Sequence, residues 1–315
     1  MNERRYGIDC IYLGACAWDA RLTRICVASI RYFYPDVPIR LLAGDILQAG
    51  LADELKRYWN VDLHDLPRTD FGSGFVKLEP LFGPPGERFL MLDVDTIFAG
   101  PVLDAFADCD APFIADLETL PDADLKRLYY DWDRIADIDP NVQPAHKAFN
   151  TGQWFGTAGV LRREDFDRWV EWKLPRRLHF PDRFMTGDQG VMTYLLLQKE
   201  ALEGLRIERR KLMRWPGHSM EGLDLARVAA RKAPGQVVHW AGMKNVFLRK
   251  MASADLLLFF ENYYYSKMPG KQLRRWRDNA YHVWLHYRHQ LGVRAKQRYR
   301  KLVARRALPG LPASS

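Results

Sequence analysis

The sequence contains few cysteines and no long apolar run. Four of its 315 residues are cysteines, Cys10, Cys16, Cys26 and Cys109, and they form no Cys-x-x-Cys pair. This argues against a disulfide framework or a structural zinc site, so the cysteines are expected to be reduced and mostly buried. No apolar run approaches the roughly 18 residues needed to cross a bilayer. The first residues show no signal-peptide core, and a cytoplasmic location is expected.

Acidic residues are almost missing from the C-terminal segment. Between Lys271 and Arg306 there are twelve Lys or Arg residues and one acid, Asp278, which gives 12 − 1 = +11. Because the whole chain carries +8, the remainder carries 8 − 11 = −3. The basic character therefore belongs to this segment. No nucleic-acid partner is expected, because no known binding module accompanies the charge.

The rest of the chain has the composition of a well-packed globular protein, with 48% hydrophobic and 13% aromatic residues. Strand and helix patterns alternate along its first part, at 8–13, 19–34, 39–43, 51–59 and from 61. This alternation predicts an α/β fold with a parallel sheet and helices on its faces. We expect one domain over residues 1–250, followed by a basic, amphipathic helical extension over 251–315.

Later elements are predicted from periodicity and from glycine or proline boundaries. Strands are expected at 112–117 and 237–240, and helices at 163–172, 187–199 and 253–267. The segment 119–148 is polar and rich in Asp and Pro, which predicts irregular structure.

The run Phe89-Leu90-Met91-Leu92 leads directly into Asp93-Val94-Asp95. Residues one apart in a strand share a face, so the carboxylates of Asp93 and Asp95 can point the same way. Two such carboxylates repel each other unless a cation lies between them, and a divalent cation carrying a phosphate-rich substrate meets that need. The alternative is an ordinary Asp-x-Asp loop, and the preceding apolar run favours the metal site. We expect this strand at the centre of the sheet, where ligands bind beyond the carboxyl ends of the strands.

Further motifs follow in a fixed order around this pair. They are Lys77, Phe149-Asn150-Thr151-Gly152, Gly187-Asp188-Gln189 and His239-Trp240-Ala241-Gly242-Met243-Lys244. Taken together they resemble the nucleotide-sugar glycosyltransferases of the GT-A fold, most closely family 8, which includes glycogenin and bacterial lipopolysaccharide galactosyltransferases. The resemblance implies a mixed, mostly parallel Rossmann-like sheet. It also implies transfer of a sugar from a nucleotide-diphosphate donor, with a UDP-sugar expected, to a glycan or glycolipid acceptor.

The resemblance assigns a metal ion to Asp93, Asp95 and His239, with Mn²⁺ or Mg²⁺ expected and an imidazole ligand favouring Mn²⁺. It places Val94 and Gly242 among the donor-binding residues. A buried strand-end histidine bonded to backbone is the alternative for His239.

The phosphate-binding lysine departs from the family pattern. Lys244 would meet the departing phosphates as a point charge. The motif here is His-x-x-Gly-x-Lys, one residue shorter than is usual in the family, and Asn245-Val246 follows it. This shortening motivates a second hypothesis, a nucleotide-sugar-binding or scaffolding protein of the same fold without catalysis.

The remaining site residues take their roles from the same resemblance. Asn150 would hold a sugar hydroxyl, or form an ordinary Asn-x-Gly turn. Asp188 and Gln189 would lie beside the reacting carbon, although Asp188 at a helix start also suits a capping carboxylate. Asp116 would contact the donor sugar. Lys77 would neutralise the metal carboxylates, or be a solvated surface lysine.

The motifs decide neither the stereochemical outcome of the transfer nor the identity of the nucleotide base. The family favours retention, whereas inversion would need a carboxylate base such as Asp188 on the acceptor hydroxyl. The loop Gly14-Ala15-Cys16-Ala17-Trp18-Asp19 does not align with the family's uracil-reading loop, so UDP is expected from resemblance alone.

An apolar stripe runs through the basic C-terminal segment at helical spacing. Its members are Leu273, Trp276, Ala280, Trp284, Tyr287 and Leu291. A basic, aromatic amphipathic helix suits in-plane binding to an anionic membrane surface through 271–306, near lipid-linked acceptors. The alternative is a helix packed on the catalytic domain or against a second subunit, as in a homo-oligomer.

Overall fold

The computed structural model describes residues 6–44, 47–66, 71–72, 74–185, 187–217, 220–243 and 245–306, with only the backbone at 17, 289 and 292–306. The chain forms two compact units, Met1–Lys267 and Met268–Ser315. The first unit contains the sheets and the candidate site.

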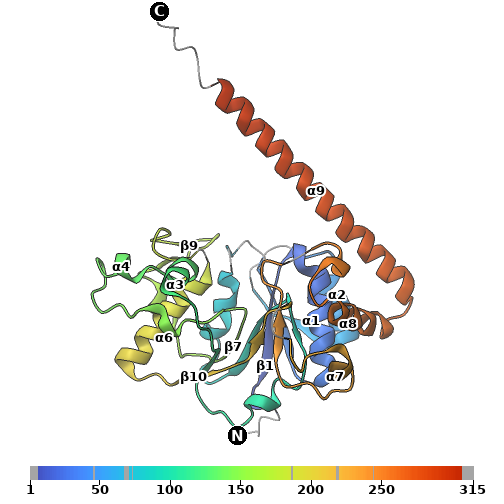
Figure 1. Ribbon diagram of the computed structural model, residues 1–315, viewed down its shortest axis with the longest axis horizontal. Helices are drawn as coiled ribbons and strands as arrows, with labels where there is room; N and C mark the ends of the chain where they lie inside the picture. Colours follow the sequence, from blue (N-terminus) through green and yellow to red (C-terminus); the bar gives the residue numbers. More distant parts are fainter. Residues whose placement is uncertain are drawn as a thin grey trace, which may run out of the picture. The chain divides into compact units, whose positions relative to one another are not determined.

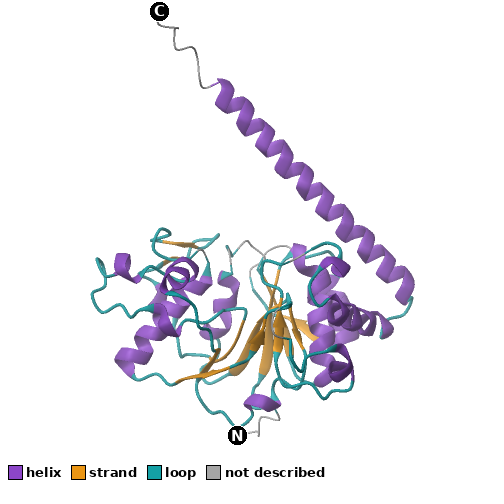
Figure 2. Cartoon of the chain, in the orientation of Figure 1, coloured by secondary structure: helices purple, strands orange, loops and turns teal. Residues whose placement is uncertain are grey.

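A seven-stranded sheet lies at the centre of the first unit (Figure 2). Its strands, in spatial order, are β10 (Ile207–Arg210), β6 (Phe113–Asp116), β7 (Gln153–Thr157), β4 (Arg88–Asp93), β1 (Cys10–Ala15), β2 (Ile39–Ala43) and β3 (Val61–Leu63). Neighbouring strands are parallel except around β7, which is antiparallel to both β4 and β6. The predicted mixed, mostly parallel sheet is confirmed, and so is the central place of the strand that ends at Asp93.

Helices cover the two faces of this sheet (Figure 1). One face carries α1 (Ala20–Phe33), α2 (Leu51–Trp59), α7 (Leu225–Ala229) and α8 (Ala254–Ser266). The other carries α3 (Asp122–Leu128), α4 (Trp132–Ile135) and α6 (Asp188–Glu203). The short α5 (Arg163–Phe166) packs against α6. α1 ends just before Pro35, because proline cannot continue a helix. On α8, Tyr264 stacks on Trp59 with ring centroids 4.8 Å apart.

After β4 the chain enters a second, smaller sheet. It consists of β11 (Met213–Arg214), β12 (Val237–His239) and β5 (Thr96–Phe98), with β12 parallel to β11 and antiparallel to β5. Asp93 is the last residue of β4, and Val94 and Asp95 form the turn into β5. Asp95 therefore lies outside the strand. The direction of its side chain is set by the turn between the two sheets and not by the alternation of side chains along a strand.

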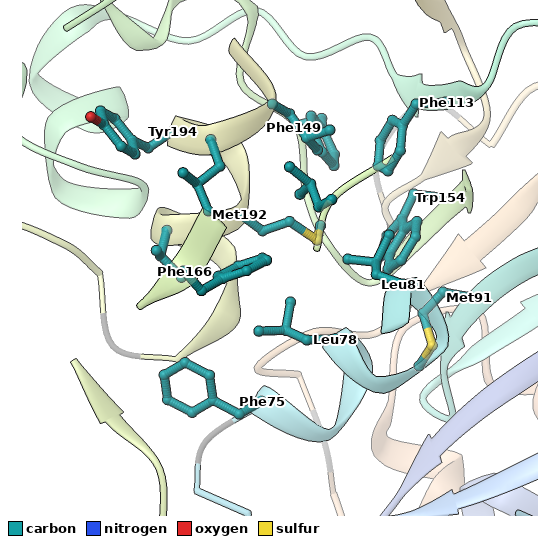
Figure 3. Close-up of a cluster of buried hydrophobic side chains, with 14 of the residues drawn as sticks. Phe75, Leu78, Leu81, Met91, Phe113, Phe149, Trp154, Phe166, Met192 and Tyr194 are labelled. Atoms are coloured by element: carbon teal, nitrogen blue, oxygen red, sulfur yellow. The ribbon is translucent and has the colours of Figure 1, made fainter. Parts of the chain in front are cut away.

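The core on the α6 side of the central sheet is strongly aromatic. Figure 3 shows side chains from β4, β7, α6 and the 3₁₀ helix η2 (Phe75–Phe82) meeting there. Trp154 stacks on Phe113 at 5.2 Å and meets Phe89 edge-on at 5.3 Å. Met91 of β4 belongs to this core. Asp93, two residues further along the strand, therefore projects from the same face.

Three local expectations were wrong. The helix expected at 163–172 ends at Phe166, because the Trp169 N–H bonds to the Phe166 carbonyl (2.8 Å) and the chain then pairs as β8 (Val170–Glu171) with β9 (Arg177–Leu178). The segment expected to be irregular contains α3, α4 and the 3₁₀ helix η4 (Ala145–Lys147). The first strand begins at Cys10, two residues later than expected.

The second unit contains one long helix, α9 (Lys271–Arg306). Among the described residues, no helix is long and apolar enough to cross a membrane. The sequence-based boundary at residue 250 lies before α8, whereas the two compact units divide after it, at Lys267. The apolar stripe residues Leu273, Trp276, Trp284, Tyr287 and Leu291 are all exposed.

Candidate active site

Two aspartates and a histidine meet where the central sheet passes into the second sheet. Antiparallel pairing places His239 of β12 opposite Thr96, beside the Val94–Asp95 turn. The Trp240 N–H bonds to the Asp95 carbonyl at 2.9 Å, which fixes the turn against the end of β12. Nε2 of His239 lies 3.2 Å from Oδ1 of Asp95 and 3.9 Å from Oδ2 of Asp93.

The donor set of this cluster fits a divalent cation. One ligand atom from each of Asp93, Asp95 and His239 can be chosen so that all lie within 4.8 Å of one another. His239 is only 1% exposed, and within the described part of the chain neither of its ring nitrogens makes a hydrogen bond. A buried imidazole without a hydrogen-bond partner is costly unless something else satisfies it. Two carboxylates and an imidazole suit Mn²⁺ or Mg²⁺, and the nitrogen favours Mn²⁺.

The Asn150–Gly152 turn lies against the imidazole. Oδ1 of Asn150 accepts a hydrogen bond from the Gly152 N–H at 2.8 Å, the geometry of an Asx turn. A Cβ atom at Gly152 would lie 2.1 Å from Cε1 of His239, so only glycine fits there. Among the described residues, the side-chain amide nitrogen of Asn150 has no hydrogen-bond partner, so it is available to a ligand hydroxyl.

Lys77 is buried beneath the aspartates and is not a solvated surface lysine. Its Nζ lies 3.3 Å from Oδ1 of Asp93 and 3.2 Å from Oδ2 of Asp188, and it donates to the Thr151 carbonyl at 3.3 Å. Burial by itself lowers the pKa of Lys77, but the carboxylates of Asp188 and Asp93 outweigh it and raise that pKa above its usual value. The lysine is therefore a fixed positive charge next to Asp93 of the metal cluster.

Asp188 is buried at the start of α6, and its carboxylate is packed on several sides. A Cβ atom at Gly74 would lie 2.0 Å from its Oδ1, so the Gly74 backbone directly abuts it. Burial raises the pKa of Asp188, opposed by Lys77 and by a hydrogen bond from Thr151. Asp188 is the first residue of α6, directly after the N-cap residue Gly187. The structure adds a contact with Lys77 that the sequence did not predict, and the place of Asp188 beside the reacting carbon stays a prediction.

Both ends of the Gln189 side chain are bonded to backbone. Its Oε1 accepts from the Thr151 N–H at 3.3 Å, and its Nε2 donates to the Leu128 carbonyl at 2.9 Å. The residue thus ties the Asn150–Gly152 turn to the end of α3.

Asp116 is fully buried and its two carboxylate oxygens are engaged within the protein. Oδ1 accepts from the backbone N–H groups of Leu212 (2.7 Å) and Met213 (2.9 Å), and Oδ2 lies 3.3 Å from Nζ of Lys211. Burial raises the pKa of this carboxyl, which Lys211 and the backbone donors oppose. These contacts fasten the end of β6 to the β10–β11 connection.

The other predicted donor-binding residues are placed differently. Val94 is buried within the turn between the aspartates. Gly242 follows β12 with φ of 70°, a left-handed conformation that glycine tolerates, and its α-carbon faces open space. Lys244 lies outside the described residues, so the shortened His-to-Lys spacing stays a sequence observation.

Two neighbours of the cluster were missed in the sequence. Trp215 stacks on His239, with ring centroids 5.5 Å apart and planes 16° apart. Glu118 accepts a hydrogen bond from the Tyr129 hydroxyl, and burial raises its pKa. Glu118 could have been noticed as the second acid of Asp-x-Glu directly after a strand. Trp215 carries no such local signal, because only strand pairing brings it to the site.

The fold is that of solved GT-A glycosyltransferases, which confirms the predicted fold class. The galactosyltransferase LgtC, solved with donor and acceptor sugar analogs, matches with a TM-score of 0.55 at 15% identity, over 85% of this chain and 99% of that chain. The bifunctional glycosyltransferase WbbM matches with a TM-score of 0.52 at 14% identity, over 84% of this chain and 50% of that chain. No protein-family model matches the chain, and no curated protein is significantly similar in sequence. Identities this low establish the shared fold, and function must be argued from the site.

Proposed function

We propose that this chain is a metal-dependent glycosyltransferase that moves a sugar from a nucleotide-diphosphate donor, a UDP-sugar by resemblance, to a glycan or glycolipid. The observation that carries the proposal is the meeting of Asp93, Asp95 and His239 at the carboxyl edge of a GT-A sheet. In open α/β sheets this edge is where ligands bind.

Five side chains of the site have defined roles in this proposal. Asp93, Asp95 and His239 would hold Mn²⁺ or Mg²⁺, which when bound supplies Lewis-acid stabilisation of the diphosphate leaving group. Lys77 holds Asp93 from below and offsets the repulsion between the clustered carboxylates. The amide nitrogen of Asn150 would donate to a hydroxyl of the sugar.

The environment of Asp188 supports retention over inversion. An inverting enzyme needs a carboxylate that reaches the acceptor hydroxyl and removes its proton. The carboxylate of Asp188 is buried, lies 3.2 Å from Nζ of Lys77 and abuts the backbone of Gly74. A base so enclosed cannot approach an acceptor without breaking these contacts. We therefore assign Asp188 to holding Lys77 in place.

Thermal unfolding with and without ligands tests the proposal. Mn²⁺ should raise the melting temperature of the wild type, and a nucleotide sugar should raise it further, because both bind only the folded state. Asp95→Asn should remove the Mn²⁺ shift together with donor hydrolysis. Asp62→Asn, at an exposed aspartate far along the sheet, is the matched control and should change neither.

The same experiment separates the enzyme from the second hypothesis. Stabilisation by a nucleotide sugar without hydrolysis or transfer would favour a binding or scaffolding protein. Unchanged Mn²⁺ stabilisation and activity in Asp95→Asn would overturn the metal site.

We also propose that α9 binds an anionic membrane surface near a lipid-linked acceptor. Its apolar stripe is exposed, and the guanidinium of Arg288 lies over the ring of Trp284 at 5.2 Å, so cationic and aromatic groups share one surface. Such a surface suits the lipid headgroup region. Vesicles containing phosphatidylserine should carry the full chain upward in a flotation assay, and a Trp276→Ser, Trp284→Ser variant should stay below. Equal flotation of the two would refute membrane binding, and a change in light-scattering mass would indicate a self-association surface.

A further inference from the structure

The imidazole of His239 is held by packing on its face. β11 runs parallel to β12, with Met213 paired to Val237 and Arg214 to Val238. One residue further along each strand, this register brings Trp215 beside His239. The two rings are nearly parallel, 16° apart, with centroids separated by 5.5 Å.

A second surface limits the same ring at its edge. The Cε1 and Nδ1 atoms face Gly152, where a Cβ atom would lie 2.1 Å from Cε1 and 2.7 Å from Nδ1. The next ring atom, Nε2, faces Asp95 and Asp93. The indole of Trp215 therefore packs on the face of the imidazole ring, and the Gly152 backbone packs against its Nδ1–Cε1 edge.

A metal-binding histidine is usually oriented by a hydrogen bond from its second nitrogen to a carboxylate or carbonyl. In the described part of the chain, Nδ1 of His239 has no such partner. On the Nδ1 side, rotation of the imidazole about its Cβ–Cγ bond is consequently opposed by packing, whereas Nε2 lies close to Asp95. Trp215 supplies the flat surface that permits one orientation of the plane.

We propose that Trp215 is a positioning residue that holds the His239 imidazole with Nε2 toward Asp93 and Asp95. The inference rests on the proposed metal site and adds a residue that the motifs did not contain. It predicts that a flat side chain at position 215 is needed for tight metal binding, whereas the indole nitrogen is not.

Three variants of the full chain test this. Trp215→Leu removes the flat surface, and Mn²⁺ affinity should fall about ten- to a hundredfold, the range found when groups that orient a ligand are removed. Trp215→Phe keeps an aromatic face and should stay within about threefold of the wild type on the same scale. Trp132→Leu is the matched control, because Trp132 is also half-buried and also touches a histidine ring, that of His146 at 5.7 Å.

Mn²⁺ affinity can be measured directly from the electron paramagnetic resonance signal of the free ion, without any turnover assay. Thermal unfolding of each metal-free variant checks that it is folded. Weak binding in Trp215→Leu with near-normal binding in Trp215→Phe and Trp132→Leu supports the inference. Equal affinity in Trp215→Leu and the wild type overturns it, and so does a Trp215→Phe variant as weak as Trp215→Leu. If the wild type itself binds no Mn²⁺, the proposed metal function fails, a result distinct from either outcome.

Discussion

Replacing Lys77 with methionine removes a buried positive charge that contacts Asp93 of the metal cluster. The side chain is 9% exposed, and its Nζ lies within 3.4 Å of both Asp93 and Asp188. Methionine keeps most of the volume but leaves Asp188, whose side chain is 6% exposed, without its positive partner. Removing one member of a buried ion pair costs about 3–5 kcal/mol. We expect a loss of that size in the free energy of unfolding of the metal-free protein.

The pH at which the loss appears follows from the direction of the pKa shift. The pKa of Lys77 is raised above its ordinary value of 10.5, so its stabilising effect is complete below that pH and disappears only as the pH rises through the higher folded value. At pH 7 the full difference between the wild type and Lys77→Met should therefore be present in urea titrations.

Lys56→Met is the matched control for this experiment. Nζ of Lys56 lies 3.4 Å from Asp62, a distance similar to those at Lys77, but the two side chains are 72% and 65% exposed. An exposed pair contributes only about 0.2–1 kcal/mol. Adding Mn²⁺ should stabilise Lys77→Met more than the wild type, because the ion then supplies the missing positive charge. Equal losses in the two methionine variants would refute the argument that burial makes Lys77 important.

Three further substitutions test separate parts of the site. In Gly152→Ala, His239 must move by at least 3.4 − 2.1 = 1.3 Å to restore an ordinary contact with the new Cβ atom. Calorimetry should therefore show that this variant no longer binds Mn²⁺. Gly83→Ala is the control and should bind Mn²⁺ normally, because the atom nearest to its Cβ would be 3.3 Å away. Gln189→Met leaves the Thr151 N–H and the Leu128 carbonyl unpaired, and chemical denaturation should show a loss of about 1–3 kcal/mol; no loss would mean that the bridge is not formed. Glu118→Gln should become more stable relative to the wild type as the pH rises from 4.5 to 7, because the raised pKa of Glu118 means that its ionisation opposes folding; a difference in melting temperature that does not change with pH would contradict this.

Local patterns predicted the parts of the fold that depend on nearby residues. The apolar run before Asp93 correctly predicted a central strand, and the periodicity of 187–199 predicted a helix that the structure has as α6. The antiparallel strand β7 was not foreseen, because Gln153–Thr157 contains a glutamine, a glycine and a threonine and shows little apolar pattern. Its strand character depends on pairing with β4 and β6.

The candidate site shows the same division. The motifs predicted that Asp93, Asp95 and His239 would meet, and their ligand atoms do lie together. The stated reason was incomplete, since Asp95 reaches the cluster through a turn between two sheets. Asp116 and Gln189 form hydrogen bonds to backbone groups of distant segments, and Trp215 stacks on His239 from another strand. Spacing along a single sequence does not contain that information.

The passage of the chain from one sheet to the other at the Val94–Asp95 turn has a consequence for assembly. Asp93 and His239 are separated by 239 − 93 = 146 positions and belong to different sheets, so no short segment contains the ligand set. A bound ion would act as a cross-link that closes this long loop. In the chain-entropy model, a covalent bridge over about 100 residues stabilises a fold by roughly 4–5 kcal/mol. Metal loading should therefore slow amide hydrogen exchange in β5 and β12 together, joining the two sheets into one cooperative unit.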